Sequence, residues 1–366
     1  MPVSRVDERY MAAAIRLSRR HIGLTATNPS VATLIVTPDG IIAGRGVTAR
    51  GGRPHAEPIA LAEAGDQARG ATAYVTLEPC AHHGRTPPCA EALITAGVAR
   101  VVGGASDPDD RVSGRGYAML RAAGIEVTEN VLAAEAADAM AGYLIRSVNK
   151  RPEVILKLAV SSDGMIGRKG EGQVAITGAQ ARARAHLLRA QTHAILVGSG
   201  TALADDPELT CRLPGLEQRS PVRIVVGNVA GMHPGSKLLS SARQIPLWLA
   251  TGGAMLSNGP DFSEYGARIL ASETFEGRVA LPELLEDLAS QGIMSVLVEG
   301  GANIASSFLT EELVDRIVLF TADMAIGDDG IRSPLQADTI PGKFELARGE
   351  KLGEDRCMEW VRKERF

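Results

Sequence analysis

The sequence has little of what marks several classes of protein. Only 4% of its residues are aromatic, too few for a long stacking platform for single-stranded nucleic acid. Its 39 Lys and Arg residues are outnumbered by 43 Asp and Glu, so the formal net charge is −4. Proteins that bind nucleic acid or anionic lipid usually carry a basic excess. We therefore expect no nucleic-acid partner.

Long apolar runs and cysteines are also scarce. No window approaches about 18 uninterrupted apolar residues, so no transmembrane helix is expected. The stretch from Met1 to Arg20 alternates charged and apolar residues and lacks a signal-peptide core with a cleavage site. Four cysteines are too few for a disulfide framework, so each is first interpreted as a small buried hydrophobe. These absences predict a cytoplasmic protein with no membrane partner.

What remains is the composition of an ordinary globular protein, with 45% hydrophobic and 22% charged residues. At roughly 150 residues per domain, 366 residues suggest two or three domains. In the first part, short apolar bursts alternate with alanine- and leucine-rich helical patterns, which predicts an α/β layered domain. Strands are expected at Val31–Val36, Ala73–Leu77 and Ala99–Gly103, and helices at Glu57–Ala68, Cys89–Gly97, Gly116–Ala123 and Leu132–Val148. Gly97 and Gly124 are expected to end helices.

The charged segment Asn149-Lys150-Arg151-Pro152 is a predicted linker. It places the domain boundary between residues 149 and 150, which gives domains 1–149 and 150–366. Strands are then expected at Val154–Val160, Ala194–Val197, Val222–Val226, Pro246–Ala250, Ser295–Val298 and Ile317–Thr321, and helices at Gln180–Ala190, Pro282–Ser290 and Asn303–Leu309. The two halves do not resemble each other, which indicates a fusion of different α/β domains. The polar tail after Gly327 gives no clear prediction.

One constellation in the first half predicts a zinc site. His55-Ala56-Glu57 is followed by Pro79-Cys80 and, after eight intervening residues, by Cys89. One imidazole and two thiolates suit zinc with a fourth position open, and a bound water then becomes acidic enough to supply hydroxide near neutral pH. Glu57 would not bind metal but could carry a proton from that water to the substrate. This is the pattern of zinc-dependent deaminases, apart from the longer spacing between the cysteines.

The alternative is that both cysteines are buried thiols and that His55 is an ordinary loop histidine. The combination with Thr76-Leu77-Glu78-Pro79-Cys80 after a strand, and with a cysteine at a helix start, favours zinc. Cys211 and Cys357 have no partner motif and are interpreted as structural.

The longer spacing has its own parallel. The segment Thr76–Cys89 (TLEPCAHHGRTPPC), with His55-Ala56-Glu57, resembles the deaminase half of the bifunctional pyrimidine deaminase/reductase family of riboflavin biosynthesis. The resemblance implies a cytidine-deaminase-like α/β/α layered domain. It also implies that four residues contact the aminopyrimidine or its ribose phosphate: Asn28, His82, Arg85 and Asp107. Arg85 could instead be a solvated loop arginine. Thr48 stands where the family often has a histidine, which puts one substrate contact in doubt.

The second half lacks a G-x-G-x-x-G fingerprint. Its better feature is Val298-Glu299-Gly300-Gly301-Ala302-Asn303, a strand that runs through two glycines into a helical pattern. Backbone amides at a helix start make an anion site suited to a dinucleotide phosphate, although the same motif could be only a tight turn.

This half resembles the family's reductase domain, whose fold is similar to dihydrofolate reductase. The matching pieces include Leu156-Lys157-Leu158-Ala159, Leu188-Arg189-Ala190, Leu203–Pro207 and Leu209–Arg212. The resemblance implies NADPH as cofactor and Lys157 as a candidate for the active centre. It places Gln173, Arg189, Leu209, Arg212 and Glu299 against the substrate, and Ala159, Ala175, Thr201, Asp205 and Gly301 against the cofactor. Ala175 and Gln173 depart from a tryptophan and a serine in relatives.

We therefore expect a bifunctional cytoplasmic enzyme that uses Zn²⁺ and NADPH. It would hydrolyse the 2-amino group of 2,5-diamino-6-ribosylamino-4(3H)-pyrimidinone 5′-phosphate and then reduce the ribosyl to a ribityl chain. The expected partner is this small phosphorylated aminopyrimidine, and the chain is expected to form a homo-oligomer, a dimer or tetramer. The alternative is a deaminase of another pyrimidine or of a tRNA adenosine, with an inactive second half. A non-enzymatic nucleotide-binding module is a third hypothesis.

Overall fold

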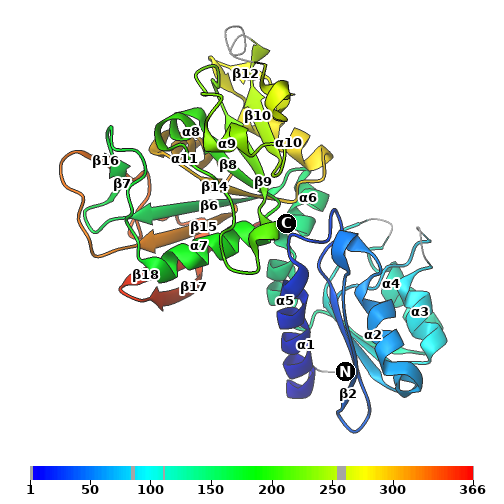
Figure 1. Cartoon of the computed structure of the whole chain (residues 1–366). Coiled ribbons are helices and arrows are strands. Elements are labelled where there is room, and N and C mark those ends of the chain that lie inside the picture. Colours follow the sequence, from blue (N-terminus) through cyan, green and yellow to red (C-terminus); the bar gives the residue numbers. More distant parts are fainter. Residues whose placement is uncertain (1–2, 84–86, 110–111, 254–260, 366) are drawn as a thin grey trace. The chain divides into compact units, whose positions relative to one another are not determined.

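The computed structural model describes residues 3–83, 87–109, 112–253 and 261–365. The chain forms two compact units, Met1–Asn149 and Lys150–Phe366, which are coloured blue to cyan and green to red in Figure 1. Each unit has its own sheet and its own hydrophobic core. Among the described residues, no helix is long and apolar enough to cross a membrane.

The first unit is a three-layer α/β/α domain. Its sheet has the order β2-β1-β3-β4-β5, in which β1 is antiparallel to both neighbours and β3, β4 and β5 are parallel. Helices α1 and α5 pack on one face, and α2 packs on β1 and β2 with α3 and α4 beside it (Figure 1). The bounds are β1 Ala32–Val36, β2 Ile42–Val47, β3 Thr72–Leu77, β4 Arg100–Ala105, β5 Glu126–Thr128, α1 Arg5–Ser18, α2 Ala56–Ala64, α3 Cys89–Ala96, α4 Arg115–Ala122, α5 Ala133–Ala139 and α6 Ala141–Asn149.

Two glycines bring α2 close to the sheet. A Cβ atom added at Gly46 of β2 would lie 1.9 Å from the carbonyl oxygen of Ala56, the first residue of α2. At Gly44 it would lie 2.1 Å from the carbonyl oxygen of Ala60, one turn later. Only residues without a side chain allow this approach. The start of α2 is thereby fixed against the sheet.

The structure confirms much of the predicted pattern in this unit and corrects two helices. Gly97 ends α3 in the left-handed conformation, as expected. The single helix predicted over Leu132–Val148 is wrong, because Met140 takes φ −122° and ψ 19° and separates α5 from α6. The helix predicted over Glu57–Ala68 ends at Ala64, since Gly65 takes a positive φ and a 3₁₀ turn follows.

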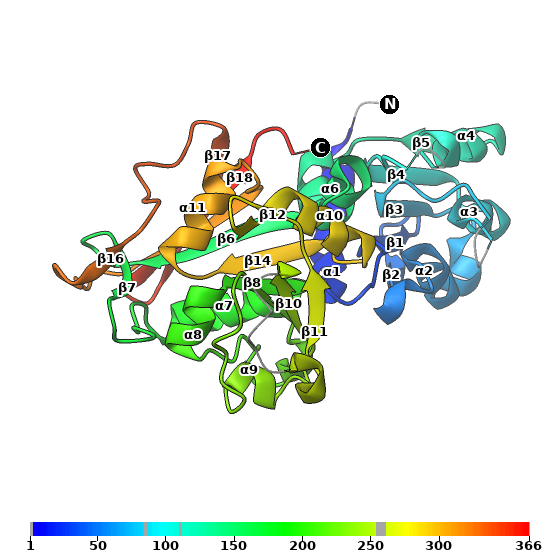
Figure 2. The ribbon, with the colours of Figure 1, turned by 90° about the horizontal axis from the view of Figure 1, so that it is seen from above.

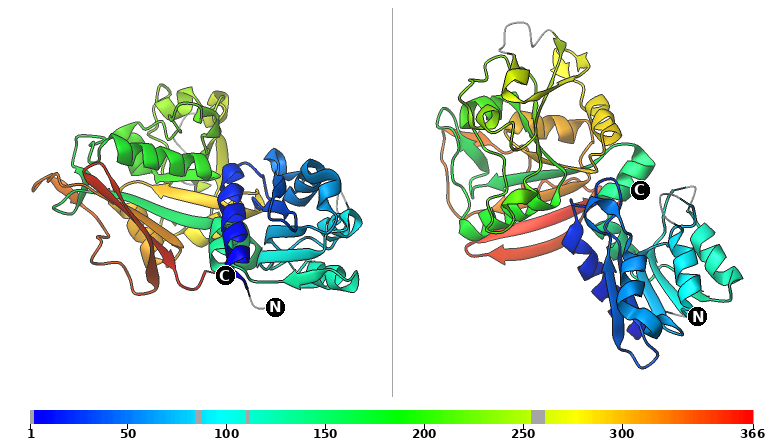
Figure 3. Two further views of the ribbon diagram at one scale, coloured as in Figure 1. Left: turned by 90° about the horizontal axis from the view of Figure 1, so that it is seen from below. Right: turned by 45° about the vertical axis from the view of Figure 1, so that its right-hand side comes forward.

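The second unit contains a larger sheet with the order β11-β10-β9-β8-β14-β6-β15-β18-β17. The strands from β11 to β15 are parallel, and β18 and β17 add an antiparallel hairpin at one edge. Figure 3 shows this hairpin in orange and red. In this unit β7 pairs with β16, and β12 with β13, in two further small sheets. The strands of the second unit are β6 Glu153–Val160, β7 Met165–Arg168, β8 Ala194–Gly198, β9 Val222–Val226, β10 Leu247–Thr251, β11 Arg268–Ala271, β12 Thr274–Phe275, β13 Arg278–Val279, β14 Ser295–Glu299, β15 Arg316–Thr321, β16 Gly330–Arg332, β17 Phe344–Leu352 and β18 Asp355–Arg362.

Helices cover both faces of this sheet. Helices α7, α8 and α9 lie on one face and α10 and α11 on the other (Figure 2). Their bounds are α7 Ala179–Gln191, α8 Ser199–Asp205, α9 Lys237–Ser240, α10 Leu281–Ser290 and α11 Ala302–Thr310. All the strands and helices predicted for this half are present, with ends that shift by at most one residue. Side chains alternate along β6, so that Ile155, Lys157 and Ala159 face α7 while Leu156 and Leu158 face α10 and α11.

Candidate functional sites

The predicted zinc ligands converge at the carboxyl edge of the first sheet. Cys80 follows β3, His55 precedes the first residue of α2, and Cys89 is the first residue of α3. Their candidate ligand atoms all lie within 4.8 Å of one another. His55 and Cys89 lie at the starts of α2 and α3, so the positive ends of both helix dipoles are close to the site. A positive helix end favours the thiolate form of a cysteine.

The distances fit a tetrahedral zinc ion. His55 Nδ1 lies 3.3 Å from Cys89 Sγ and 3.8 Å from Cys80 Sγ. Zinc bond lengths of about 2.3 Å to sulfur and 2.0 Å to nitrogen put adjacent ligands about 3.6 Å apart at tetrahedral angles. The donor set therefore suits zinc and leaves a fourth position open. Hydrogen bonds from Cys89 and His55 lower the pKa of the Cys80 thiol to about 4, which prepares a thiolate ligand.

Glu57 lies beside these ligands and is only 4% exposed. Burial and the negative charge of Cys80 raise the pKa of Glu57. A carboxyl group that can both take up and release a proton is suited to acid–base work. This is the chemistry that the sequence assigns to Glu57, and the geometry is compatible with it.

The structure describes three of the four predicted deaminase substrate residues. Asp107 follows β4 and is 6% exposed. His82 has a buried Nδ1 with no hydrogen-bond partner in the described part of the chain. Asn28 packs against Gly52, three residues before His55, since a Cβ atom at Gly52 would lie 2.3 Å from its side-chain nitrogen. Arg85 lies outside the described residues.

The side chain of Thr48 is directed to the backbone. Its hydroxyl accepts the N–H of Val31 at 3.1 Å, next to the start of β1. The threonine found in place of the family's frequent histidine therefore supports a strand.

Glu78 is a buried carboxylate to which the sequence motif alone gave no role. Its oxygens accept the backbone N–H groups of Gly114 and Gly116, both at 3.0 Å. A Cβ atom at Gly116 would lie only 2.0 Å from the carbonyl oxygen of Pro79. Glu78 thus holds the start of α4 against the residue that precedes Cys80. A carboxylate directly after a buried strand is the signal that could have suggested this role.

In the second unit, three predicted site residues form one charged cluster on the α7 face of the sheet. Nε and Nη2 of Arg189 donate to the two carboxylate oxygens of Glu299 at 2.8 and 3.0 Å. Lys157 Nζ lies 3.4 Å from Glu299 Oε2. Burial alone would raise the pKa of Glu299, but the charges of Arg189 and Lys157 and their hydrogen bonds lower it to about 2. The cluster therefore holds a permanent carboxylate at the end of β14.

Three residues predicted to lie against the reductase substrate, Arg189, Arg212 and Leu209, differ in accessibility. Nη1 of Arg189 also donates to the carbonyl oxygen of Thr210 at 3.0 Å, so this guanidinium is already occupied. Arg212 is half-exposed and pairs with Glu208 at 2.7 Å. The side chain of Leu209 is buried in a core cluster, and its φ is 56°. Only the backbone of this residue is therefore available to contact a substrate.

Two of the predicted cofactor residues meet at the carboxyl ends of the parallel strands. The N–H of Gly301, at the start of α11, donates to Thr201 Oγ1 of α8 at 2.9 Å, although 100 residues separate them. Asp205 ends α8, and Ala159 lies on β6 opposite Phe320 of β15. In open α/β sheets this edge is where ligands bind. Ala175 and Gln173 are exposed in the segment that precedes α7.

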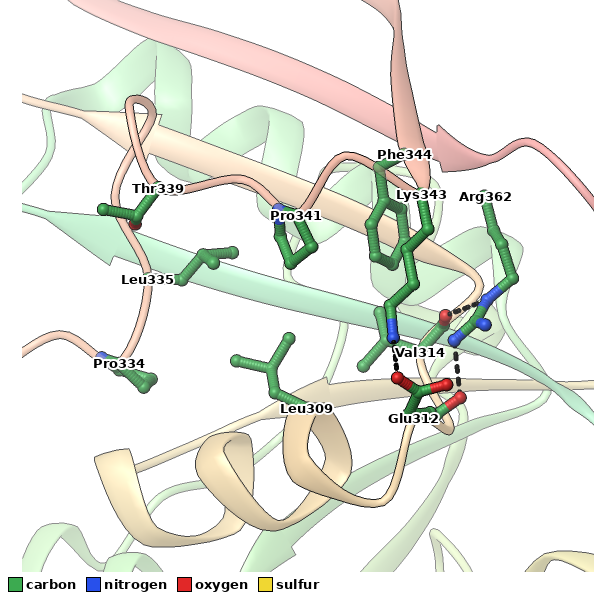
Figure 4. Close-up of a pocket in the computed structure, with 10 residues that line it drawn as sticks. All are labelled: Leu309, Glu312, Val314, Pro334, Leu335, Thr339, Pro341, Lys343, Phe344 and Arg362. Atoms are coloured by element: carbon green, nitrogen blue, oxygen red, sulfur yellow. Dashed lines mark hydrogen bonds and ion pairs between the residues drawn. The ribbon is translucent and has the colours of Figure 1, made fainter.

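A separate pocket of about 200 Å³ lies on the other face of the second sheet (Figure 4). Leu309, Leu335 and Phe344 supply apolar walls, and Lys343 is paired with Glu312. None of the predicted site residues lines it, and the charged cluster faces α7 instead. We assign it no part in the chemistry.

Comparison with known proteins decides the family. Residues 4–105 match the family model of the cytidine and deoxycytidylate deaminase zinc-binding region. Residues 152–358 match that of the RibD C-terminal domain. The chain belongs to the RibD family. It is 40% identical to the riboflavin biosynthesis protein RibD of Escherichia coli (strain K12), over 97% of this chain and 99% of that protein. It is 37% identical to RibD of Aquifex aeolicus, over 96% and 98%.

Solved structures agree with this membership in the RibD family. A structure of Acinetobacter baumannii RibD matches with a TM-score of 0.84 and 34% identity, over 98% of this chain and 99% of that one. A Thermotoga maritima deaminase/reductase matches with a TM-score of 0.85 and 31% identity, over the same shares. The chain is a bifunctional enzyme of riboflavin biosynthesis, with a deaminase that uses Zn²⁺ and a reductase that uses NADPH. Membership in the RibD family does not favour the alternative of an inactive second half.

Proposed function

We propose that residues 1–149 deaminate 2,5-diamino-6-ribosylamino-4(3H)-pyrimidinone 5′-phosphate and that residues 150–366 reduce the product to 5-amino-6-ribitylaminouracil 5′-phosphate. The observation that carries the proposal is the cluster of His55, Cys80 and Cys89 with the buried Glu57. The same chain also contains a second α/β unit with its own sheet. The similar Thermotoga maritima protein is a diaminohydroxyphosphoribosylaminopyrimidine deaminase and 5-amino-6-(5-phosphoribosylamino)uracil reductase, which supports the same pair of substrates here.

In the deaminase, His55, Cys80 and Cys89 would hold zinc, which lowers the pKa of a bound water. Glu57 would carry two protons in turn: the first from the attacking water to the ring nitrogen, and the second from the hydroxyl then left on the ring carbon to the departing amine. Asp107, Asn28 and His82 contact the substrate, and Arg85 its phosphate. Nδ1 of His82 is buried and has no hydrogen-bond partner among the described residues, which supports such a contact because buried polar atoms normally have partners.

In the reductase, NADPH supplies the hydride. Thr201, Asp205, Gly301, Ala159 and Ala175 would contact this cofactor. Arg212, Leu209 and Gln173 contact the substrate. Arg189 holds Glu299, and Lys157 lies beside that carboxylate at the reacting centre. These residues bring the ribose carbon to the hydride in a reactive geometry.

The proposal extends to assembly and location. The chain would work in the cytoplasm as a homo-oligomer, a dimer or tetramer. Support comes from the resemblance of its motifs to the family described above.

Substitution of Glu57 tests the deaminase assignment. Glu57→Gln should keep the zinc content of the wild type and lose nearly all deamination, because general acid–base catalysis contributes about 10²- to 10⁴-fold. Reduction of the deaminated substrate with NADPH should be unchanged. Zinc is measured by elemental analysis, and each half is assayed with its own substrate.

Glu63→Gln is the matched control, since Glu63 lies on the same helix but is exposed and paired with Arg45. It should leave both activities intact. Normal deamination by Glu57→Gln would contradict the role of Glu57 as proton carrier.

A further inference from the structure

Asp107 lies at the edge of the first sheet where the metal ligands converge. In the parallel pair of β3 and β4, Leu77 is opposite Ala105, so Cys80 and Asp107 follow the two strands at the same edge of the sheet. Asp107 is 6% exposed, and its Oδ1 accepts the N–H of Asp109 at 2.9 Å. A buried carboxylate needs donors to keep its charge and its orientation.

A second donor comes from α6. The hydroxyl of Tyr143 donates to Asp107 Oδ1 at 3.0 Å and lies 3.2 Å from Oδ2. The next two residues, Leu144 and Ile145, are buried, and the Tyr143 side chain packs against the core of the first unit. The hydroxyl is therefore presented from a fixed helix to the middle of the carboxylate, and a phenol has few rotamers in which to leave it.

The protonation state supports this donor role. Burial and the charge of Asp107 raise the pKa of Tyr143, so the hydroxyl keeps its proton at any physiological pH. Hydrogen bonds in which one partner is charged are roughly twice as strong as neutral ones. Loss of the hydroxyl would leave the carboxylate free to turn away from the place where the substrate binds.

We propose that Tyr143 is a positioning residue of the deaminase, whose hydroxyl holds the Asp107 carboxylate in the orientation that binds the aminopyrimidine. The inference rests on the proposed function, which gives Asp107 its contact with the substrate. Tyr143 touches no substrate atom in this scheme and acts through Asp107.

The test is Tyr143→Phe, which removes one oxygen and keeps the ring. We expect kcat/KM for deamination to fall about 10-fold, the effect of one hydrogen bond to a charged group, and mainly through a higher KM. Zinc content should be unchanged, and so should reduction of separately supplied deaminated substrate. Tyr10→Phe is the matched control, because its hydroxyl donates to Gly40 on an exposed turn of the same unit.

A double-mutant cycle separates positioning from a general loss of structure. If Tyr143 acts through Asp107, then Asp107→Asn with Tyr143→Phe should be no worse than Asp107→Asn alone. Two outcomes would overturn the positioning role alone. One is a kcat/KM for Tyr143→Phe equal to that for Tyr10→Phe, and the other is a double variant in which the losses from Asp107→Asn and Tyr143→Phe multiply. Wild-type enzyme that fails to deaminate this substrate would overturn the proposed function as well.

Discussion

At the scale of single residues, buried charge is paired in ways that fix the functional groups. Glu299 keeps its charge because Arg189 and Lys157 surround it. Asp7 is another buried and paired charge, but it lies outside the predicted sites. It caps α1 together with Ser4, receives two hydrogen bonds from Arg100 and one from the hydroxyl of Tyr74, and is 2% exposed.

Asp7 gives a prediction about pH. Burial alone would raise its pKa, but the hydrogen bonds from Arg100, Ser4 and Tyr74 lower it from 3.8 to about 2. A depressed folded-state pKa stabilises the protein above the unfolded-state pKa, and this contribution is lost as the pH falls from about 4 to 2. Asp7→Asn should therefore lower the free energy of unfolding of the first unit by about 2 kcal/mol at pH 7.

The measurement is denaturant unfolding at several pH values. The difference from the wild type should shrink below pH 4. Asp66→Asn, at an exposed position, should have little effect at any pH. A difference for Asp7→Asn that stayed constant down to pH 2 would speak against the ion pair as its cause.

At the scale of elements, the deaminase centre depends on close approach between helices and strand ends. The start of α4 lies against Pro79 through Gly116, and Glu78 accepts two of its backbone N–H groups. Gly116→Ala should push α4 away from the strand end that leads to Cys80. We expect a loss of stability of roughly 1–3 kcal/mol, as for other overpacked sites, with weaker zinc binding.

Thermal unfolding and zinc titration measure these two effects. Ala118→Ser changes an exposed position of the same helix and should leave both unchanged. If Gly116→Ala had the zinc affinity and stability of the wild type, α4 would be able to move away from Pro79 without cost.

The elements also show what sequence patterns can predict. Strands such as β8 and β14 are buried apolar runs bounded by helical patterns, so they were predictable. The break at Met140 was not, because the alanine-rich segment before it and the amphipathic segment after it both favour helix, and no proline separates them. Strand β17 was missed because most of its residues are exposed and charged residues interrupt its apolar ones, so no buried apolar run marks it; its pairing with β18 supplies the order. The motif could suggest His55, Cys80 and Cys89, whereas Tyr143 lies on a helix with no motif.

At the scale of the whole molecule, two chemistries share one chain but have separate cores. Zinc binding should therefore stabilise the first unit only. When free zinc exceeds its dissociation constant 1,000-fold, the stabilisation amounts to about 4 kcal/mol. Removal of zinc with a chelator should lower one thermal transition and abolish deamination, while the reductase activity and the other transition persist.

Differential scanning calorimetry with and without chelator checks this, with Cys89→Ser as a variant that should bind less zinc. Addition of zinc should restore the lowered transition in the wild type. Equal shifts of both transitions on chelation would contradict a metal site confined to the first unit.

The order of strands in the second sheet has a consequence for how the protein is made. Strand β6, the first of this unit, pairs with β14 and β15, and β15 is flanked by β18, whose residues end at Arg362 of 366. The first unit, in contrast, is complete by residue 149. Domains generally fold from the N-terminus during synthesis. The deaminase half can thus fold while later residues are still being synthesised, whereas the reductase sheet must wait until β18 has left the exit tunnel of the ribosome.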